Sequence, residues 1–198
     1  MRFYFLGLSF LSFLFLKAQS PFDTVDFEHP DISLIEALVG EKVDSLRLCH
    51  QLNALHYDFI LDKAAKDHAF YLLTRQELSH YQRFYKKHDV MQRIRYYGAG
   101  NLTLAGENLL WQHPARLKRW NKKMKKYVSR FFYTYDSLAD SIVAAWVKSP
   151  SHFRNLLRPG YTTTAVAIAF DSRKKELICA QVFANTRLSG KTASAGIR

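Results

Sequence analysis

The fold of this chain is decided by the stretch Trp146-Val147-Lys148-Ser149-Pro150-Ser151-His152-Phe153-Arg154-Asn155-Leu156-Leu157-Arg158-Pro159-Gly160-Tyr161. A helix with apolar residues at helical spacing ends here at a Ser-Pro pair, and a second short helical turn follows until a Pro-Gly pair closes it. His152 therefore falls at the N-terminus of the second turn. Unpaired backbone N–H groups and the positive end of the helix dipole disfavour a protonated ring there. We expect His152 to be neutral and able to accept a hydrogen bond or bind a metal ion.

The residues before this stretch predict four helices. Apolar residues recur at helical spacing across 32–52, from a capping Asp58 to about residue 77, across 90–97, and from a capping Asp136 to the Ser-Pro stop. The first two helices should form one layer. His68 lies near the alanine face of the second helix, where a lone histidine is expected to be a hydrogen-bonded core residue rather than a ligand.

The residues after this stretch predict an antiparallel hairpin and a tail. Residues 162–170 and 176–184 are rich in Val, Ile, Ala and aromatic residues, and a charged turn separates them. Residues 186–198 are small or polar and lack core periodicity, so we expect a disordered tail.

The N-terminus is typical of a secretory signal. Residues 1–18 combine a basic residue, an apolar run and a plausible cleavage site before Gln19. An uncleaved anchor is the alternative, but the apolar run is shorter than an ordinary membrane-spanning helix. Residues 19–31 are polar and acidic and are interpreted as a leader. We therefore expect a secreted or periplasmic protein.

The positive charge is concentrated in one block. Residues 111–135 hold eight Lys or Arg residues and no Asp or Glu, which accounts for most of the net charge of +12. Apolar residues at helical intervals within this block predict an amphipathic basic helix. The helix could pack on the domain and leave a solvated basic face, or it could dock on an anionic membrane or envelope surface. The residues expected to carry that contact are Lys122, Lys123, Lys125 and Lys126. Nucleic acid ranks below these partners because no base-reading motif accompanies the block.

The two cysteines are expected to be separate buried thiols. Cys49 lies on a predicted helix and Cys179 in a predicted strand, each with apolar neighbours. A disulfide between them is the alternative for a secreted chain, but the sequence does not show that their Cα atoms approach closely enough. Gly-x-Ser-x-Gly, Gly-rich phosphate-loop and Cys-x-x-Cys motifs are all absent from the sequence.

The stretch around His152 resembles the Trp, three residues, Pro-Gly-His-Arg-x-Asn-Ile-Leu signature of bacterial members of the CAP superfamily of cysteine-rich secretory, antigen 5 and pathogenesis-related proteins. Further matches, in the family's order, are residues 58–69, Leu78-Ser79-His80, Gly106-Glu107-Asn108-Leu109 and Gln181-Val182-Phe183. The resemblance covers about residues 32–185. It implies an α+β fold, a three-layer α/β/α sandwich whose small, mainly antiparallel sheet is covered by helices. Residues 111–135 are then an insertion.

The resemblance also implies that His80, Glu107 and His152 converge on one cleft, which Asn108, Ser149 and Asn155 help to line. Two imidazoles and a carboxylate match the His₂Glu type of zinc site, so zinc or another divalent metal is a candidate cofactor. The same groups could act as general acid and base. Alternatively, Glu107 orients the histidines in a hydrogen-bonded network without turnover.

The chain departs from the family's pattern near His152. Ser149 stands where many eukaryotic relatives have a second acidic residue, which weakens a four-residue site but leaves the three-residue site intact. Ser151 and Phe153 replace the usual Gly and Arg that flank the histidine.

Our leading hypothesis is a secreted or periplasmic CAP-domain protein that binds a lipid, peptide or cell-wall fragment in this cleft, with a metal as a candidate participant. The alternatives are a metal-dependent, protease-like hydrolase that uses the same cleft, and an envelope-docking protein that acts through the basic helix. The sequence alone assigns no enzymatic activity.

Overall fold

The computed structural model describes residues 19–100, 102–113 and 115–185, with only the backbone described across 115–121 and 126–131. The predicted signal (1–18) and the predicted tail (186–198) lie outside the described residues. Within the described part of the chain, no helix is long and apolar enough to cross a membrane.

One four-stranded sheet forms the centre of the molecule. Its strand order is β1-β5-β6-β2, from β1 (His56–Tyr57), β5 (Thr163–Asp171), β6 (Glu176–Ala184) and β2 (Ala105–Gln112). β5 and β6 form the predicted antiparallel hairpin, β2 pairs antiparallel with β6, and the short β1 runs parallel to β5. The sheet is therefore mainly antiparallel, as predicted.

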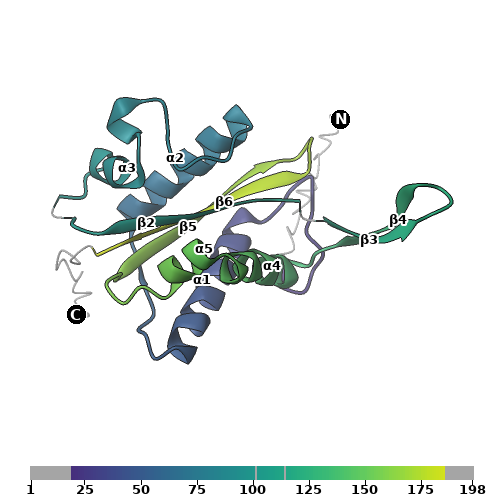
Figure 1. The fold of residues 1–198 in the computed structure, drawn as a ribbon, viewed down its shortest axis with the longest axis horizontal. Coiled ribbons are helices and arrows are strands. Elements are labelled where there is room, and N and C mark those ends of the chain that lie inside the picture. Colours follow the sequence, from purple (N-terminus) through teal and green to yellow (C-terminus); the bar gives the residue numbers. More distant parts are fainter. Residues whose placement is uncertain (1–18, 101, 114, 186–198) are drawn as a thin grey trace, which may run out of the picture.

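Helices cover both faces of this sheet (Figure 1). α1 (Ile32–Cys49), α4 (Tyr135–Lys148) and α5 (Pro150–Leu156) lie on one face, whereas α2 (Phe59–Arg75) and α3 (Val90–Tyr96) lie on the other. A short 3-10 turn, η1 (Tyr85–Lys87), precedes α3. The predicted α+β class and the three-layer α/β/α arrangement are both confirmed.

The alternation of residues along β5 explains how two cores share one sheet. Val166 and Ile168 belong to the core beneath α1 and α4. The small residues Ala165, Ala167 and Ala169 face the core beneath α2. Successive strand residues point to opposite faces, and alanines allow a helix to approach the sheet backbone closely. The sequence of β5 thus places larger side chains in the core beneath α1 and α4. It places small side chains in the core beneath α2, where the helix can pack close to the sheet.

The helix boundaries follow capping chemistry. Asp58 caps α2 by accepting hydrogen bonds from the backbone N–H groups of Ile60 and Leu61, as predicted. Ser149 ends α4 in an extended conformation and begins α5, with Pro150 as the first residue of the new helix.

The predicted cap of α4 at Asp136 is wrong. Thr134 caps this helix through a capping box with Ser137. Asp136 lies in the first turn, where its carboxylate accepts a hydrogen bond of 2.7 Å from Lys42 Nζ.

The predicted basic helix across 111–135 is also wrong. The segment begins with the end of β2 and continues as β3 (Ala115–Asn121), a turn and β4 (Lys126–Phe132), which pair only with each other. Figure 1 shows this hairpin, here called the arm, projecting from the three-layer body. The pairing register shifts between Leu117 and Arg119 and again between Arg119 and Trp120. A bulge adds one residue to a strand. Apolar residues that would be two positions apart in a regular strand are then three positions apart, and this is the spacing that indicated a helix.

The leader packs against the base of the arm. Val25 is buried in the core beneath α1, and its N–H donates to the carbonyl of Tyr133. Thr24 bridges Thr134, and the rings of Phe27 and Phe132 meet edge to face at 5.1 Å. Residues 19–31 therefore hold the arm to the domain, which their polar composition did not predict.

Both cysteines are free, so the prediction of separate thiols is confirmed. Cys179 is buried as expected, but Cys49 is exposed because it occupies the last residue of α1.

Candidate functional site

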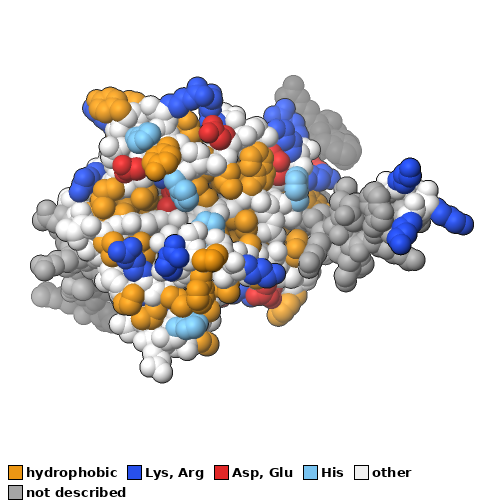
Figure 2. All heavy atoms as spheres, in the orientation of Figure 1, with side chains coloured by type: hydrophobic (Ala, Val, Ile, Leu, Met, Phe, Trp, Pro, Cys, Tyr) orange, Lys and Arg blue, Asp and Glu red, His pale blue; other side chains and the backbone are white. Residues whose placement is uncertain are grey.

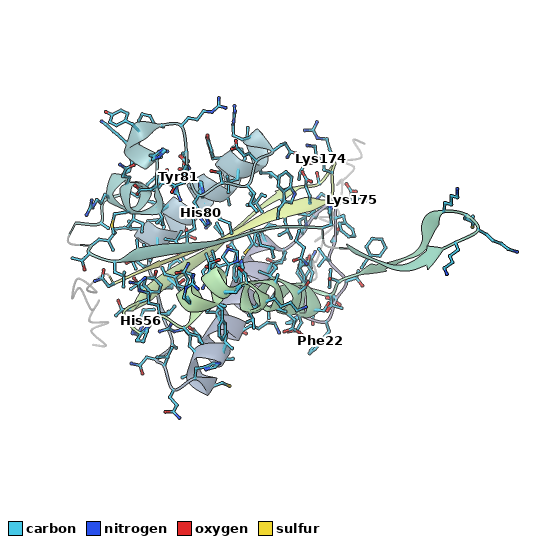
Figure 3. The ribbon with its side chains drawn as sticks, viewed as in Figure 1. Phe22, His56, His80, Tyr81, Lys174 and Lys175 are labelled. Carbon is cyan, nitrogen blue, oxygen red and sulfur yellow. The ribbon has the colours of Figure 1, made fainter. Side chains whose placement is uncertain are left out.

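The site begins with a histidine that is held by a buried carboxylate. His80 lies on the loop between α2 and η1, and Glu107 lies in β2. The His80 Nδ1 is 2.9 Å from Glu107 Oε2, with 52% of the His80 side chain exposed but only 2% of Glu107. Figure 3 places His80 beside Tyr81 on this loop above the sheet. One end of the imidazole is therefore fixed inside the protein while the other reaches the surface.

Glu107 is held in its charged form. Burial opposes its ionisation, but the hydrogen bond with His80 and the charge of Arg93 outweigh burial and lower the pKa of Glu107 below its usual value. Arg93 Nη2 donates to Glu107 Oε1 at 2.5 Å, and His68 Nε2 lies 3.5 Å from Glu107 Oε2. Both carboxylate oxygens are thus occupied by protein groups.

The charge on Glu107 fixes the tautomer of His80. A carboxylate can only accept hydrogen bonds, so the proton must lie on His80 Nδ1. In the neutral ring, Nε2 then carries a lone pair. The half-exposed end of His80 is therefore a hydrogen-bond acceptor or a base.

Arg93 joins the loop that carries His80 to the sheet. Its side chain is fully buried in α3 and pairs with Glu107. Its Nη1 also donates to the backbone carbonyls of His80, Lys87 and His88 at 3.2 to 3.3 Å. The role of Arg93 was not predicted from the sequence. The only local signal was its place beside Ile94 on the buried face of a short helix.

His68 is the hydrogen-bonded core histidine that the sequence predicted. It is fully buried, its Nε2 is 2.9 Å from the carbonyl of Ser79, and its Nδ1 is 3.1 Å from Gln82 Nε2. Burial, with smaller contributions from the charges of Arg93 and His80, lowers the pKa of His68 to about 4. The ring is thus neutral, and it donates to Ser79 while accepting from Gln82. The sequence did not predict that it would lie against Glu107.

His152 lies within electrostatic reach of His80. It is the third residue of α5, and its ring is partly buried. Burial and the charge that His80 can carry lower the pKa of His152. The predicted neutral ring is therefore supported, although the main cause is burial rather than the helix dipole.

The two asparagines connect α5 to β2. Asn108 is fully buried and donates to the carbonyl of His152 at 3.2 Å. Asn155 donates to the carbonyl of Glu107 at 3.1 Å and to Asn108 Oδ1 at 3.0 Å. These residues hold His152 in register with Glu107, and Asn108 has no surface to offer a ligand. Ser149 contacts Ser151, Oγ to Oγ, at 3.2 Å beside this connection.

Gly106 gives room for a buried tyrosine next to the site. A Cβ at this position would lie 2.0 Å from Tyr161 Oη. Tyr161 is almost fully buried and stacks on Phe183 with a centroid distance of 5.1 Å. Gly106, beside Glu107, and Tyr161, at the end of the 146–161 stretch, thus pack directly against each other.

The expected His₂Glu metal set does not fit this arrangement. Each oxygen of Glu107 already accepts a hydrogen bond, Oε1 from Arg93 and Oε2 from His80, so a metal ion would compete with these groups for the carboxylate. Across the described ranges, no group of three or more His, Cys, Asp or Glu residues has an arrangement that could hold one. His80 Nε2 and the ring of His152 are the donors that remain at the site.

Comparisons with known proteins agree with this architecture. The model of the cysteine-rich secretory protein (CAP) family matches residues 41–183. An outer surface protein from Borrelia burgdorferi is similar in structure over 79% of this chain and 96% of its own, with 20% identity and a TM-score of 0.61. An extracellular protein from Bacillus anthracis that contains an SCP domain is similar over 77% of this chain and 40% of its own, with 20% identity and a TM-score of 0.56. No curated protein matches the chain.

Proposed function

Since this chain belongs to the cysteine-rich secretory protein (CAP) family, we propose that it is a protein of the cell exterior that binds a ligand at His80 and His152. The observation that carries the proposal is the hydrogen bond from His80 Nδ1 to the charged Glu107, which leaves Nε2 as a surface acceptor. The neutral ring of His152 supplies a second polar group within electrostatic reach. Such a pair suits a ligand that donates N–H or O–H groups, as peptides, hydroxylated lipids and cell-wall fragments do.

Ligand binding is favoured over metal-dependent hydrolysis by the state of Glu107. It is buried and each of its oxygens already accepts a hydrogen bond from a protein group, so it supports His80 and is poorly placed to bind a metal ion or a substrate. This hydrogen-bonded network fixes loop geometry, a role that buried polar clusters can serve without turnover. The metal-dependent hydrolase that the sequence left open has no complete donor set among the described residues.

A metal-independent hydrolase is the second candidate. One observation favours it, because a histidine oriented by a carboxylate through Nδ1 is the arrangement of a general base. His80 Nε2 could then take a proton from a water molecule. We rank this candidate below binding because hydrolysis requires, besides a base, groups that stabilise the transition state.

An exterior location is supported by two observations. Residues 1–18 have the composition of a secretory signal, and structural neighbours are described as outer surface and extracellular proteins. We propose export followed by cleavage before Gln19. N-terminal sequencing of the protein recovered from the envelope and medium tests this directly, and an N-terminus at Met1 would contradict it.

The binding proposal is tested by following the two histidine rings in solution. Protein labelled at the histidine ring carbons is titrated with three probes: a muramyl dipeptide, an unblocked tetrapeptide and lysophosphatidylglycerol. We expect one probe class to shift the His80 and His152 resonances together and saturably. Replacing either histidine by Asn should weaken that probe at least about tenfold, the cost of about 1.4 kcal/mol for a lost hydrogen bond.

His29→Asn is the matched control because His29 is exposed and lies outside the site. The variants must keep their thermal transition for the comparison to count. If none of the three probes moves either ring, or if His80→Asn and His29→Asn bind alike, the proposal is wrong. Release of product from a probe by the unsubstituted protein, lost in His80→Asn, would favour the hydrolase instead.

A further inference from the structure

The loop and helix that follow His80 carry an exposed aromatic surface. Phe84, Tyr85 and Tyr96 are 45%, 69% and 49% exposed. Phe84 meets Tyr85 and Tyr96 edge to face, at centroid distances of 5.4 and 6.1 Å. The three rings form a continuous surface, here called the aromatic ridge. Soluble proteins seldom leave connected aromatic rings in water unless the surface contacts something.

Basic side chains flank the ridge. Arg83, Lys86 and Arg95 are exposed, and none of them takes part in the ion pairs found among the described residues. Lys86 Nζ lies 5.7 Å from the centre of the Tyr85 ring. Figure 2 shows hydrophobic and basic side chains at the end of the molecule that carries α3, with acidic and histidine side chains among them. The ridge thus combines apolar rings with unpaired positive charge.

We propose that the aromatic ridge docks this protein on an anionic lipid bilayer. The boundary between head groups and acyl chains accepts the rings of Phe and Tyr, while lipid phosphates attract the flanking Arg and Lys residues. The aromatic ridge and its basic neighbours provide both the aromatic rings and the positive charges that such a contact requires. This contact is separate from the ligand proposed for His80 and His152, and either can fail without the other.

Two other occupants fit less well. A second copy of this chain would bring Arg83, Lys86 and Arg95 against their own symmetry mates, and like charges oppose such a pairing. A soluble polyanion would satisfy the charges but would leave the edge-to-face rings without an apolar partner. A bilayer can contact the aromatic rings with its apolar region and the basic side chains with its phosphates.

The orientation of the docked protein follows from chain connectivity. His80 lies on the loop that leads into the ridge, four positions before Phe84. Docking through the ridge would therefore hold the exposed end of His80 close to the membrane surface. The arm, which leaves the body from the other end of the sheet, would remain outside the contact (Figure 1).

The experiment measures partition of the purified protein onto vesicles. Vesicles of phosphatidylcholine with about 30% phosphatidylglycerol are compared with phosphatidylcholine alone across a salt series. We expect Arg83→Gln with Lys86→Gln to weaken binding about fivefold for each charge removed. Phe84→Ser with Tyr85→Ser should weaken it about tenfold, with little change in the salt slope.

Matched controls come from other parts of the surface. Tyr57 in β1 and Phe59 at the start of α2 are 63% and 60% exposed, and their replacement by Ser should leave partition unchanged. Lys174 and Lys175 lie in the β5–β6 turn, far from the ridge (Figure 3), and Gln at both positions controls for loss of charge alone. All variants alter exposed side chains, so a matching thermal transition is expected.

A depth measurement separates insertion from loose attraction. In Tyr85→Trp, lipids brominated on the acyl chain should quench the new indole on binding. An unquenched indole, or equal losses in ridge and control variants, would overturn the proposal. So would a change of oligomeric state in Phe84→Ser with Tyr85→Ser, which would assign the ridge to a second copy. Binding to a soluble polyanion such as dextran sulfate but not to vesicles would overturn it as well.

Discussion

Arg93 is the residue on which the candidate site depends most. It neutralises the buried Glu107 and ties down three carbonyls of the loop that carries His80. A buried charge without its partner is far more costly than an exposed one, whereas a buried pair as a whole contributes little net stability. The pair therefore acts mainly by fixing the geometry of His80.

The first prediction concerns that pair. Arg93→Met should lower the free energy of unfolding by about 3 to 5 kcal/mol, because it leaves Glu107 buried and charged without its partner. Urea denaturation provides the measurement. Arg95→Met on the same helix is the control, and its exposed side chain should cost less than about 1 kcal/mol. A double variant, Arg93→Met with Glu107→Leu, should be less unstable than the sum of the single changes. Strict additivity would show that the two side chains are not coupled.

The second prediction concerns pH. The folded-state pKa of His68, about 4, is below its ordinary value of 6.5, so the unfolded chain binds this proton more readily. The contribution of His68 to the free energy of unfolding is therefore fully present above about pH 6.5. It is lost as the pH drops toward about 4, and the loss is about 3 kcal/mol for a pKa shift of this size. The lowered pKa values of His152 and Glu107 act with the same sign.

Urea midpoints at several pH values across this window measure the effect. His68→Gln keeps a donor and an acceptor for Ser79 and Gln82 but removes the titration, so its stability should vary less with pH. His29→Gln, at an exposed position, should follow the unsubstituted protein. Parallel curves for His68→Gln and the unsubstituted protein would mean that His68 is not the buried neutral ring described here.

Among the elements, the arm differs most from its prediction. It forms its own two-stranded sheet, so its pairing adds nothing to the central sheet. Its turn exposes Lys122, Lys123 and Lys125, while the side chain of Lys126 lies outside the described residues. Lysines at the end of a projecting hairpin can attract an anionic surface at a distance, but they offer little apolar area to retain it.

The third prediction separates that role from the ridge. Replacing Lys122, Lys123, Lys125 and Lys126 by Gln should slow association with phosphatidylglycerol vesicles several-fold at low salt, and dissociation should change little. The thermal midpoint should remain within about 3 °C, because the side chains of Lys122, Lys123 and Lys125 are exposed. Stopped-flow light scattering measures both rates. Faster dissociation in this variant, or equal association at low and high salt, would contradict the assignment of a steering role.

At the scale of the whole molecule, the site is formed by residues from both helical layers and from the sheet between them. His80 and Arg93 come from the α2–α3 side of the sheet, His152 comes from the α5 side, and Glu107 lies in the strand between them. The polar contacts of Asn108 and Asn155 hold the layers in register. Among the described residues, contacts between protein groups thus join the layers at the site.

The fourth prediction follows from these contacts between protein groups at the site. Dialysis against EDTA should leave the thermal midpoint unchanged within about 2 °C, because the described residues join the layers at the site through contacts between protein groups. Added zinc should stabilise the protein only weakly and through His80 and His152, so the variant with both histidines replaced by Ala should lose the effect. A large fall in the midpoint after chelation, restored by zinc, would show a ligand set that the described residues do not form.

The sequence by itself determined the elements whose signals are local. Apolar spacing gave α1 to α4, Asp58 marked the start of α2, and the Ser149-Pro150 pair separated α4 from α5. The β5–β6 hairpin followed from its composition, and the motif resemblance to the CAP family is confirmed by the family match. These features depend on backbone propensity and on residues a few positions apart, which a single sequence displays directly.

Only the tertiary structure decided which side chains meet. Arg93, His68 and Glu107 are far apart in the chain, and no spacing rule joins them until α2, α3 and β2 pack together. The arm illustrates the same limit, since its apolar spacing fits a helix or a bulged hairpin equally well and strand pairing selects the hairpin. The electrostatic environment, in which charged and hydrogen-bonding partners keep Glu107 ionised and burial keeps His68 neutral, is a property of the assembled layers. Long-range packing determines it, and local sequence does not encode it.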